Sequence, residues 1–254
     1  MDTLGIDLAA QPENTAACLI HWQGGSAEVS KVACDLDDAT ILELIHGVDK
    51  AGIDVPLGWP VDFVYAISEH HALKRWPKKE RLELRYRETD LFIHDKTGLW
   101  PLSVSTDRIG VTAMRAAALS FSEAERRDRS GIGKIVEVYP AAALRQWGFD
   151  SRGYKDIKGR ETRLKLVESF LQQTKPWLCL SADQRSACEE CDDVFDALIA
   201  SLVARARAVK ITEPIPPRFM QQARVEGWIA LPKVGSLREL AVVSDADFSV
   251  LPLA

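Results

Sequence analysis

The fold is decided by residues 3–36, TLGIDLAAQPENTAACLIHWQGGSAEVSKVACDL. Its first apolar run closes at Gln11-Pro12, and a second run follows the turn-like segment QPEN. A third run begins after Gly24-Gly25 and alternates apolar and polar residues. Three such runs joined by short turns predict three strands of an antiparallel meander.

The next two segments predict a helix and a fourth strand. LDDATILELIHGV (36–48) begins with acidic residues, and its apolar residues from Ile41 to Val48 recur at helical spacing. KAGIDVPLGWP (50–60) is an apolar run that closes with proline and glycine, the pattern of a buried strand.

The rest of the chain is richer in predicted helices. Residues 62–127 hold helical stretches around 62–74 and 110–127, with a charged segment between them, and are interpreted as a helical insertion. GKIVEVYPAAALRQWG (133–148) predicts a strand followed by a helix. Two further helices and a short last strand are expected in KGRETRLKLVESFLQQ (158–173), CDDVFDALIASLVARA (191–206) and RELAVVS (238–244).

This order of elements is that of the ribonuclease H-like fold, an α/β fold in which a mixed five-stranded sheet has helices on both faces. In that topology the first and fourth strands are neighbours. We expect residues 1–254 to form a single domain that contains the helical insertion 62–127, because a chain of this length can enclose one large core.

Composition excludes several classes of protein. The chain has 46% hydrophobic and 27% charged residues and no apolar run of about 18 residues, so no membrane span is expected. The start MDTLGIDLAA lacks the basic region of a signal peptide, which favours a cytoplasmic location. A net charge of −5 argues against broad non-specific binding of nucleic acid but leaves a local basic patch open.

Five cysteines, an odd number, fit reduced thiols in the cytoplasm. Cys188 and Cys191 have C-x-x-C spacing, but no second pair of this kind accompanies them. We therefore interpret them as thiols that pack a helix rather than as a zinc or redox pair.

Acidic residues stand at the ends of the predicted strands. Asp7 closes the first strand, Asp54 the fourth, and Glu137 lies in the later strand KIVEVYP. Asp193 and Asp196, three residues apart, share one face at the start of the helix in 191–206. Close carboxylates repel one another unless a cation lies between them, and hard oxygen ligands suit Mg²⁺ or Mn²⁺. We expect all five to converge on one pocket.

Each acid also has a structural interpretation. Asp7 and Asp54 are both placed to accept hydrogen bonds in strand-ending turns, and Glu137 is a candidate partner for a buried Arg or Lys. Asp193 suits the first turn of its helix, where acids favour the helix dipole. Because Asp196 lies deeper in the helix, capping does not explain it.

The residues also resemble a known family. GIDLAAQPENTAACLI, GIDVPLGWP, RYRETD, IVEVYPAAALRQWG, RGYK and DDVFDALIAS are similar, in this order, to successive blocks of the "domain of unknown function 429" family, over approximately residues 3–205. That family is regarded as a nuclease-like branch of the ribonuclease H superfamily. The last block also resembles Holliday-junction resolvases, whose final helix carries two acids three apart.

The resemblance implies a function and a set of roles. Asp7, Asp54, Asp193 and Asp196 match the four metal-binding acids of the resolvases, and Glu137 matches the acid of the family's E-V-Y/H-P block. It implies a phosphodiesterase or nuclease that hydrolyses nucleic acid with two Mg²⁺ or Mn²⁺ ions, one activating water and the other stabilising the leaving oxygen. Resolvase-like proteins often act as dimers, so a homodimer is a candidate assembly.

Substrate contacts are expected from RYRETD and RGYK. Arg87, Thr89 and Asp90 are candidates at the rim of the pocket, where Arg87 has the paired donors to hold a phosphate. Arg87 is equally suited to pair with Glu137 or Asp90. Lys155 is a second candidate phosphate contact, although exposed lysines are common. KRWPKKER (74–81) fits either a nucleic-acid backbone or, more simply, a solvated charged face.

Two other functions remain open from the sequence. Actin-like and sugar-kinase-like phosphotransferases also begin with a glycine-aspartate strand, a turn and a threonine, here Thr15, but they need a second phosphate loop that this chain lacks. A non-catalytic binding module that has kept the fold is the third possibility. Dependence on divalent metal favours the nuclease, and stabilisation by nucleotide favours the kinase.

Overall fold

The computed structural model of the protein describes residues 1–119, 121–155 and 159–242. The expected meander is present as β1 (Asp2–Asp7), β2 (Ala16–Gln23) and β3 (Ser26–Ala33). Helix α1 (Asp38–His46) follows, with the Asp37 side chain accepting a hydrogen bond from the Thr40 amide at its N-terminus, and leads into β4 (Lys50–Asp54). The first five predicted elements are therefore confirmed.

The sheet is mixed and has the strand order β5-β4-β1-β2-β3-β6, where β5 is Ile135–Glu137 and β6 is Leu178–Cys179. β1 runs antiparallel to β2 and parallel to β4, so the first and fourth strands are neighbours as expected. The expected count of five strands is wrong, because β6 adds a sixth strand parallel to β3.

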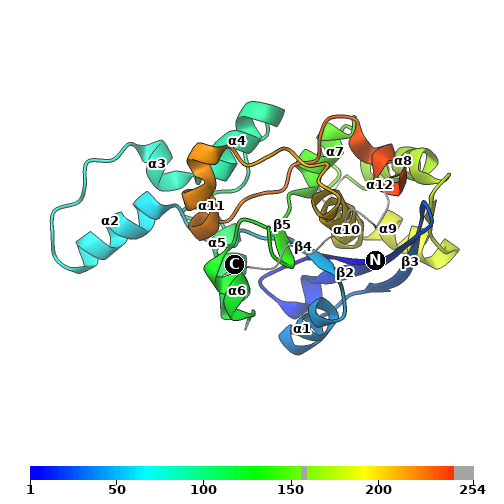
Figure 1. Ribbon diagram of the computed structural model, residues 1–254, viewed down its shortest axis with the longest axis horizontal. Coiled ribbons are helices and arrows are strands. Elements are labelled where there is room, and N and C mark those ends of the chain that lie inside the picture. The colour runs from blue at the N-terminus through cyan, green and yellow to red at the C-terminus, as the bar shows by residue number, and fades with distance from the viewer. Residues whose placement is uncertain (120, 156–158, 243–254) are drawn as a thin grey trace.

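Helices cover both faces of the sheet, as predicted (Figure 1). α10 (Asp192–Ala208) crosses one face and packs there with α7 (Pro140–Gln146) and α8 (Arg160–Thr174), and α9 (Ala182–Glu190) leads into it. α1 and α5 (Ile109–Ala118) cover the other face. The division follows the alternation of β1, whose Leu4 and Ile6 point towards α1 and α5 while Thr3 and Gly5 face α10.

The segment 62–127 has helices in both stretches where they were expected, and two more in the charged segment between them. It holds α2 (Val61–His71), α3 (Arg81–Arg85), α4 (Glu88–Thr97), α5 and α6 (Glu123–Arg127). α2 and α3 project away from the sheet (Figure 1), whereas Ala113 and Ala116 of α5 lie in the core beneath β1 and β4. The α5 part of this segment therefore completes one layer of the fold.

The C-terminal region follows α10 with short helices, which are η2 (Pro217–Phe219), α11 (Met220–Glu226), η3 (Ser236–Arg238) and α12 (Glu239–Val242). A one-turn 3-10 helix, η1 (Pro12–Asn14), lies between β1 and β2. The expected strand in RELAVVS is wrong for its described part, since α12 forms there and buries Leu240 against the α10 face of the core. Residues 243 and 244 of that segment lie outside the described residues.

The cysteines are free thiols, and Cys188 is buried in the core beneath α9, which agrees with a packing role. No helix in the described part of the chain has the length and apolar composition needed to cross a bilayer.

Candidate functional site

Asp7 and Asp54 are the last residues of two adjacent parallel strands and are paired in register. Gly5 and Gly52 are paired two residues earlier. Because side chains alternate along a strand, each aspartate lies on the same face of the sheet as the glycine two residues before it. Both carboxylates therefore project on the α10 side, at the carboxyl ends of β1 and β4.

The two glycines let α10 lie directly on the sheet. A Cβ atom on Gly5 would come within 1.9 Å of the Ala197 carbonyl oxygen, and one on Gly52 within 2.5 Å of the Ala200 carbonyl oxygen. The Ser201 hydroxyl donates to the Thr3 carbonyl at 3.0 Å and fixes the helix along β1. The first turns of α10 are thereby held over the strand ends.

The position of α10 brings Asp193 and Asp196 to the strand aspartates. Asp193 lies close enough to Asp7 for the two side chains to interact, since the charge of Asp193 raises the pKa of Asp7. Asp196 lies deeper and is fully buried. Four of the five predicted acids thus form one cluster, here called the aspartate cluster: Asp7, Asp54, Asp193 and Asp196.

Burial and mutual repulsion raise the pKa values of the aspartate cluster. Burial is the largest cause that raises the pKa of Asp7, with further increases from Asp196 and Asp54 and an opposing effect of Lys155. Burial likewise raises the pKa of Asp54 to about 7, against the effect of Lys155. When ionised, the cluster therefore concentrates negative charge in a partly desolvated environment.

Lys155 supplies the positive charge that faces the cluster. Its ammonium forms an ion pair with Asp196 and lies 4.0 Å from Asp54 Oδ2. The neighbouring Tyr154 donates its hydroxyl proton to Asp196 Oδ1 at 2.5 Å. Burial alone would lower the pKa of Lys155, but Asp196, Tyr154 and Asp54 raise it well above its ordinary value. Lys155, expected to contact phosphate, instead contacts the acids.

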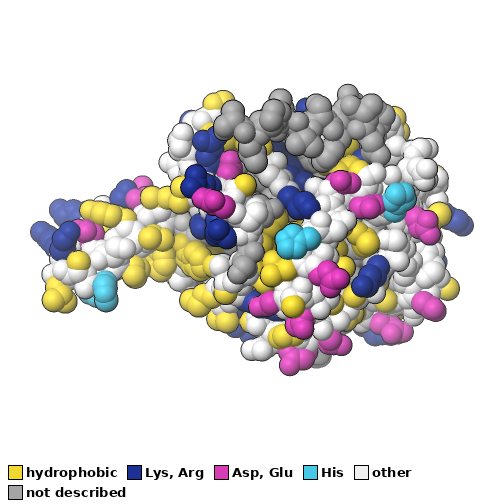
Figure 2. All heavy atoms as spheres, turned by 60° about the horizontal axis from the view of Figure 1, so that its bottom comes forward, with side chains coloured by type: hydrophobic (Ala, Val, Ile, Leu, Met, Phe, Trp, Pro, Cys, Tyr) yellow, Lys and Arg dark blue, Asp and Glu magenta, His cyan; other side chains and the backbone are white. Residues whose placement is uncertain are grey.

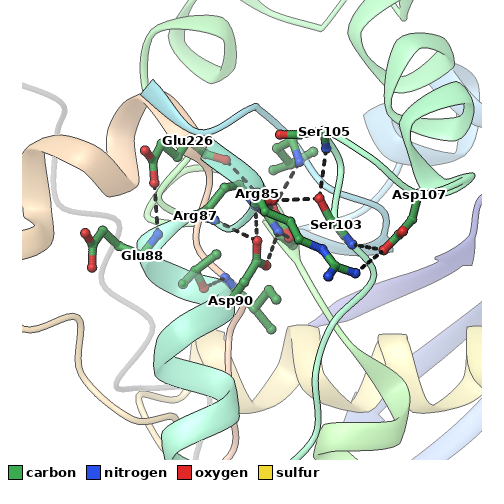
Figure 3. Close-up of polar contacts among 12 residues, drawn as sticks. Arg85, Arg87, Glu88, Asp90, Ser103, Ser105, Asp107 and Glu226 are labelled. Atoms are coloured by element: carbon green, nitrogen blue, oxygen red, sulfur yellow. Dashed lines mark hydrogen bonds and ion pairs between the residues drawn. The ribbon is translucent and has the colours of Figure 1, made fainter. Parts of the chain in front are cut away.

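Glu137 belongs to a second network, centred on Arg87. Arg87 donates to both Glu137 carboxylate oxygens, at 2.8 and 2.6 Å, and to both Asp90 carboxylate oxygens, at 3.1 and 2.8 Å. Its remaining N–H donates to the Glu226 carbonyl at 3.0 Å. All five N–H groups are therefore used. Figure 3 shows Arg87 and Asp90 pointing towards one another at the start of α4.

The same network binds distant segments together. The Leu57 amide donates to Glu137 at 3.0 Å, and the Thr89 hydroxyl accepts from the Ile229 amide at 2.8 Å. The Glu226 carboxylate accepts from the amides of Val61 and Glu88. Both sequence alternatives for Arg87 as a pairing residue, Glu137 and Asp90, occur at once, and no donor of Arg87 is left for a phosphate.

The two networks face one cleft. It encloses about 180 Å³, far more than the roughly 10–15 Å³ that one water molecule needs. Five predicted residues line it. Thr89 and Asp90 are buried outside its lining, and the two α10 aspartates do not line it but interact with Asp7 and Lys155. The predicted residues in its wall are Asp7, Asp54, Arg87, Glu137 and Lys155. Within the described residues, no three His, Cys, Asp or Glu side chains stand in a ready-made metal-binding arrangement.

Sequence reasoning missed Tyr154 and Arg163. Arg163 donates to the Tyr154 carbonyl at 3.2 Å, to the Glu189 and Glu190 carbonyls, and to the Asp192 carboxylate. It thus holds the RGYK segment against the start of α10. For Tyr154 the sequence offered one signal, an aromatic residue beside Lys155. For Arg163 it offered none, because Arg163 and Asp192 are 29 residues apart and leave no local pattern.

Comparison with protein families gives one match. The family model described as "Protein of unknown function (DUF429)" matches residues 5–220, which include both networks except the segment around Glu226. No curated protein and no solved structure matches the chain.

Proposed function

The chain belongs to the DUF429 family, and on this premise we propose that it is a Mg²⁺- or Mn²⁺-dependent phosphodiesterase of the nuclease type. The observation that carries the proposal is the in-register pair Asp7 and Asp54, over which α10 holds Asp193 and Asp196. Four acids from three separate segments form one cluster, and two of them, Asp7 and Asp54, line the cleft. Packing alone does not require this arrangement.

We also propose that the fold is ribonuclease H-like. Its central five strands have the order β3-β2-β1-β4-β5, with an antiparallel meander followed by two parallel strands. This agrees with the topology expected from the sequence, and the two-residue β6 is an addition at one edge. The aspartates then lie at the carboxyl ends of the central strands, where open α/β sheets bind ligands.

The donor set fits hard divalent cations. When all four aspartates are ionised, they carry four negative charges. Lys155 carries one positive charge, so three negative charges remain without a cation. Burial is the largest cause of the raised pKa values of Asp7 and Asp54, and repulsion from the neighbouring carboxylates adds to it. Carboxylate oxygens are the preferred ligands of Mg²⁺ and Mn²⁺. Asp7, Asp54, Asp193 and Asp196 are the residues that would hold the ions, which would supply an activated water and charge stabilisation at the leaving oxygen.

Glu137 takes a different role in this proposal from the one expected. Both of its oxygens accept from Arg87, and one also accepts from Leu57, so they are not free to bind an ion without breaking a buried network. We assign Glu137 and Arg87 as positioning residues. They fix the end of β5 and the start of α4 in the wall of the cleft.

Lys155 has to leave Asp196 for another cation to bind there. The ammonium and a divalent ion need the same carboxylate oxygens, and the Lys155 side chain is 45% exposed, which leaves it free to turn into the cleft. In that position Lys155 contributes the phosphate contact expected from the sequence. Tyr154 remains behind to hold Asp196 in place through its hydroxyl.

The test combines binding and hydrolysis. Calorimetric titration with Mn²⁺ should show saturable binding to the wild-type protein, and Asp7→Asn and Asp54→Asn should each weaken it at least tenfold. Hydrolysis of bis(p-nitrophenyl) phosphate should require Mg²⁺ or Mn²⁺ and be lost in the same variants. Asp183→Asn, which changes an exposed acid in the first turn of α9, is the matched control and should behave as wild type.

A second candidate, the non-catalytic binding module, is favoured by one observation. Asp196 already has Lys155 and Tyr154 as partners, and Glu137 already has Arg87, so the acids also serve as structural ties. This alternative predicts no Mn²⁺ binding and no hydrolysis. The kinase alternative loses support because the Thr15 hydroxyl is buried between Arg115, at 2.7 Å, and the Gln11 carbonyl, at 3.2 Å.

A further inference from the structure

Residues 61–85 form a projection, here called the arm, that is rooted at the cleft. It consists of α2, the connection 72–80 and α3, and it extends away from the sheet (Figure 1). Pro56 just before the arm and Arg87 just after it both line the cleft. A bound polymer that leaves the cleft on the side of Pro56 and Arg87 would therefore run along the arm.

The arm concentrates positive charge on an acidic protein. Residues 74–81, KRWPKKER, hold five Lys or Arg and one Glu, a net charge of +4 in a chain whose net charge is −5. Lys74 pairs with Glu69 and Lys79 with Asp62, each at 2.9 Å. The other three cations of this stretch have no acidic partner among the described residues, and they are Arg75, Lys78 and Arg81.

Aromatic and apolar side chains accompany this charge. Trp76 is 43% exposed and makes an edge contact with the His70 ring, with 5.7 Å between ring centroids. Leu73 is 96% exposed. Figure 2 shows Lys and Arg side chains at the outer end of the arm, with hydrophobic side chains along its visible face. A cationic surface with a partly exposed indole suits a flexible strand that carries both phosphates and bases.

We propose that the arm binds the backbone of a single-stranded nucleic acid whose scissile phosphodiester lies in the cleft. The proposal rests on the proposed function and names its substrate class, a polymer rather than a small phosphodiester. The unpaired cations at residues 74–81 contact phosphates, and Trp76 stacks on a base. Helix α2 has 11 residues and is about 16 Å long, which corresponds to about five nucleotides of a stacked strand at 3.4 Å per step.

The experiment measures binding apart from chemistry. Fluorescence anisotropy with labelled DNA and RNA strands of 4 and 15 nucleotides is recorded for the Asp7→Asn protein without divalent metal. We expect the 15-mer to bind at least tenfold more tightly than the 4-mer, because only the longer strand reaches the arm. Arg75→Gln, Lys78→Gln and Arg81→Gln together should remove this preference and lower the slope of log K against log salt by about 2.

Two further variants separate the contacts. Trp76→Ala should weaken 15-mer binding at least about fivefold, and Trp76→Phe should restore most of it, since a phenyl ring also stacks. Lys31→Gln with Lys210→Gln is the matched control, because both lysines are exposed and lie outside the arm, and it should bind as wild type.

The possible failures are distinguishable. Equal affinity of the two strands, or an unchanged affinity in the triple variant, overturns the role of the arm. Binding of the arm to vesicles containing phosphatidylserine but not to nucleic acid also overturns it. In each case metal-dependent hydrolysis of bis(p-nitrophenyl) phosphate still tests the proposed function separately. If the protein binds the strand but the wild type does not hydrolyse this compound with Mg²⁺ or Mn²⁺, the proposed function alone is overturned.

Discussion

Gly5 of β1 and Ala197 of α10 are in backbone contact, so close that a Cβ atom on Gly5 would stand 1.9 Å from the Ala197 carbonyl oxygen. The same Cβ would lie 2.2 Å from the Ser201 amide nitrogen. No side chain in the contact can turn away, because both neighbours are main-chain atoms. The approach of α10 to the sheet, and with it the assembly of the aspartate cluster, depends on this glycine.

Gly5→Ala should therefore destabilise the protein by about 3 kcal/mol or more, because α10 has to shift to admit the methyl group. Urea unfolding followed by circular dichroism measures the loss. Gly47→Ala is the control, since its Cβ would meet only ordinary contacts at 3.6 Å with a φ of −77°. A Gly5→Ala protein as stable as the control would show that the helix does not lie where the structure places it.

Local sequence patterns were sufficient for the centre of the fold. Runs of apolar residues with turns between them predicted β1 to β4, and the resulting order predicted that Asp7 and Asp54 are neighbours. The spacing of Asp193 and Asp196 predicted a shared helix face. These features follow from alternation and helical periodicity, which a single segment displays by itself.

The features that were missed depend on tertiary contacts. β6 has two residues, too few for any periodicity. RELAVVS has β-branched residues, yet its described part forms a helical turn because Leu240 is buried against the core. The partner of Lys155, Asp196, lies 41 residues away in sequence and was not anticipated, whereas Glu137, 50 residues from Arg87, was one of two partners that the sequence left open for Arg87. Charge alone does not tell which acid a distant cation will reach.

Lys155→Met should bind Mn²⁺ at least tenfold more tightly than the wild-type protein, since the methionine keeps the length of the side chain but removes the cation that competes for Asp196. Isothermal titration calorimetry measures the change. Lys165→Met, which removes a similar charge from an exposed pair with Glu161, should leave the affinity unaltered. If Lys155→Met binds Mn²⁺ no better than Lys165→Met, the lysine and the ion do not share ligands.

Arg87→Met should cost about 3–5 kcal/mol of stability, because two buried carboxylates lose their partner. Arg87→Lys should recover little of it, since an ammonium cannot make the paired contacts with both acids. Chemical unfolding of the two variants measures the difference. Adding Glu137→Gln to Arg87→Met should restore part of the lost stability, because it removes one unpaired buried charge. If the losses of unfolding free energy in the two single variants simply add up in the double variant, the pairing is contradicted.

The stability of the metal-free protein should fall as the pH rises from 5 to 8. Burial raises the pKa of Asp54 from 3.8 to about 7, so between these values the folded state holds a proton that the unfolded chain has released. Stability decreases with pH wherever the folded state binds more protons, and between pH 5 and 7 this group contributes up to ~3 kcal/mol at about 1.4 kcal/mol per pH unit. Urea unfolding at each pH, for wild type and Asp54→Asn, isolates the contribution of Asp54, because the amide does not titrate.

The difference in stability between the wild type and Asp54→Asn should change steadily from pH 5 to 8 and level off above pH 8. Saturating Mn²⁺ should abolish the decline in the wild type, since a bound cation favours the ionised carboxylate. A pH-independent difference would mean that Asp54 is already ionised at pH 5.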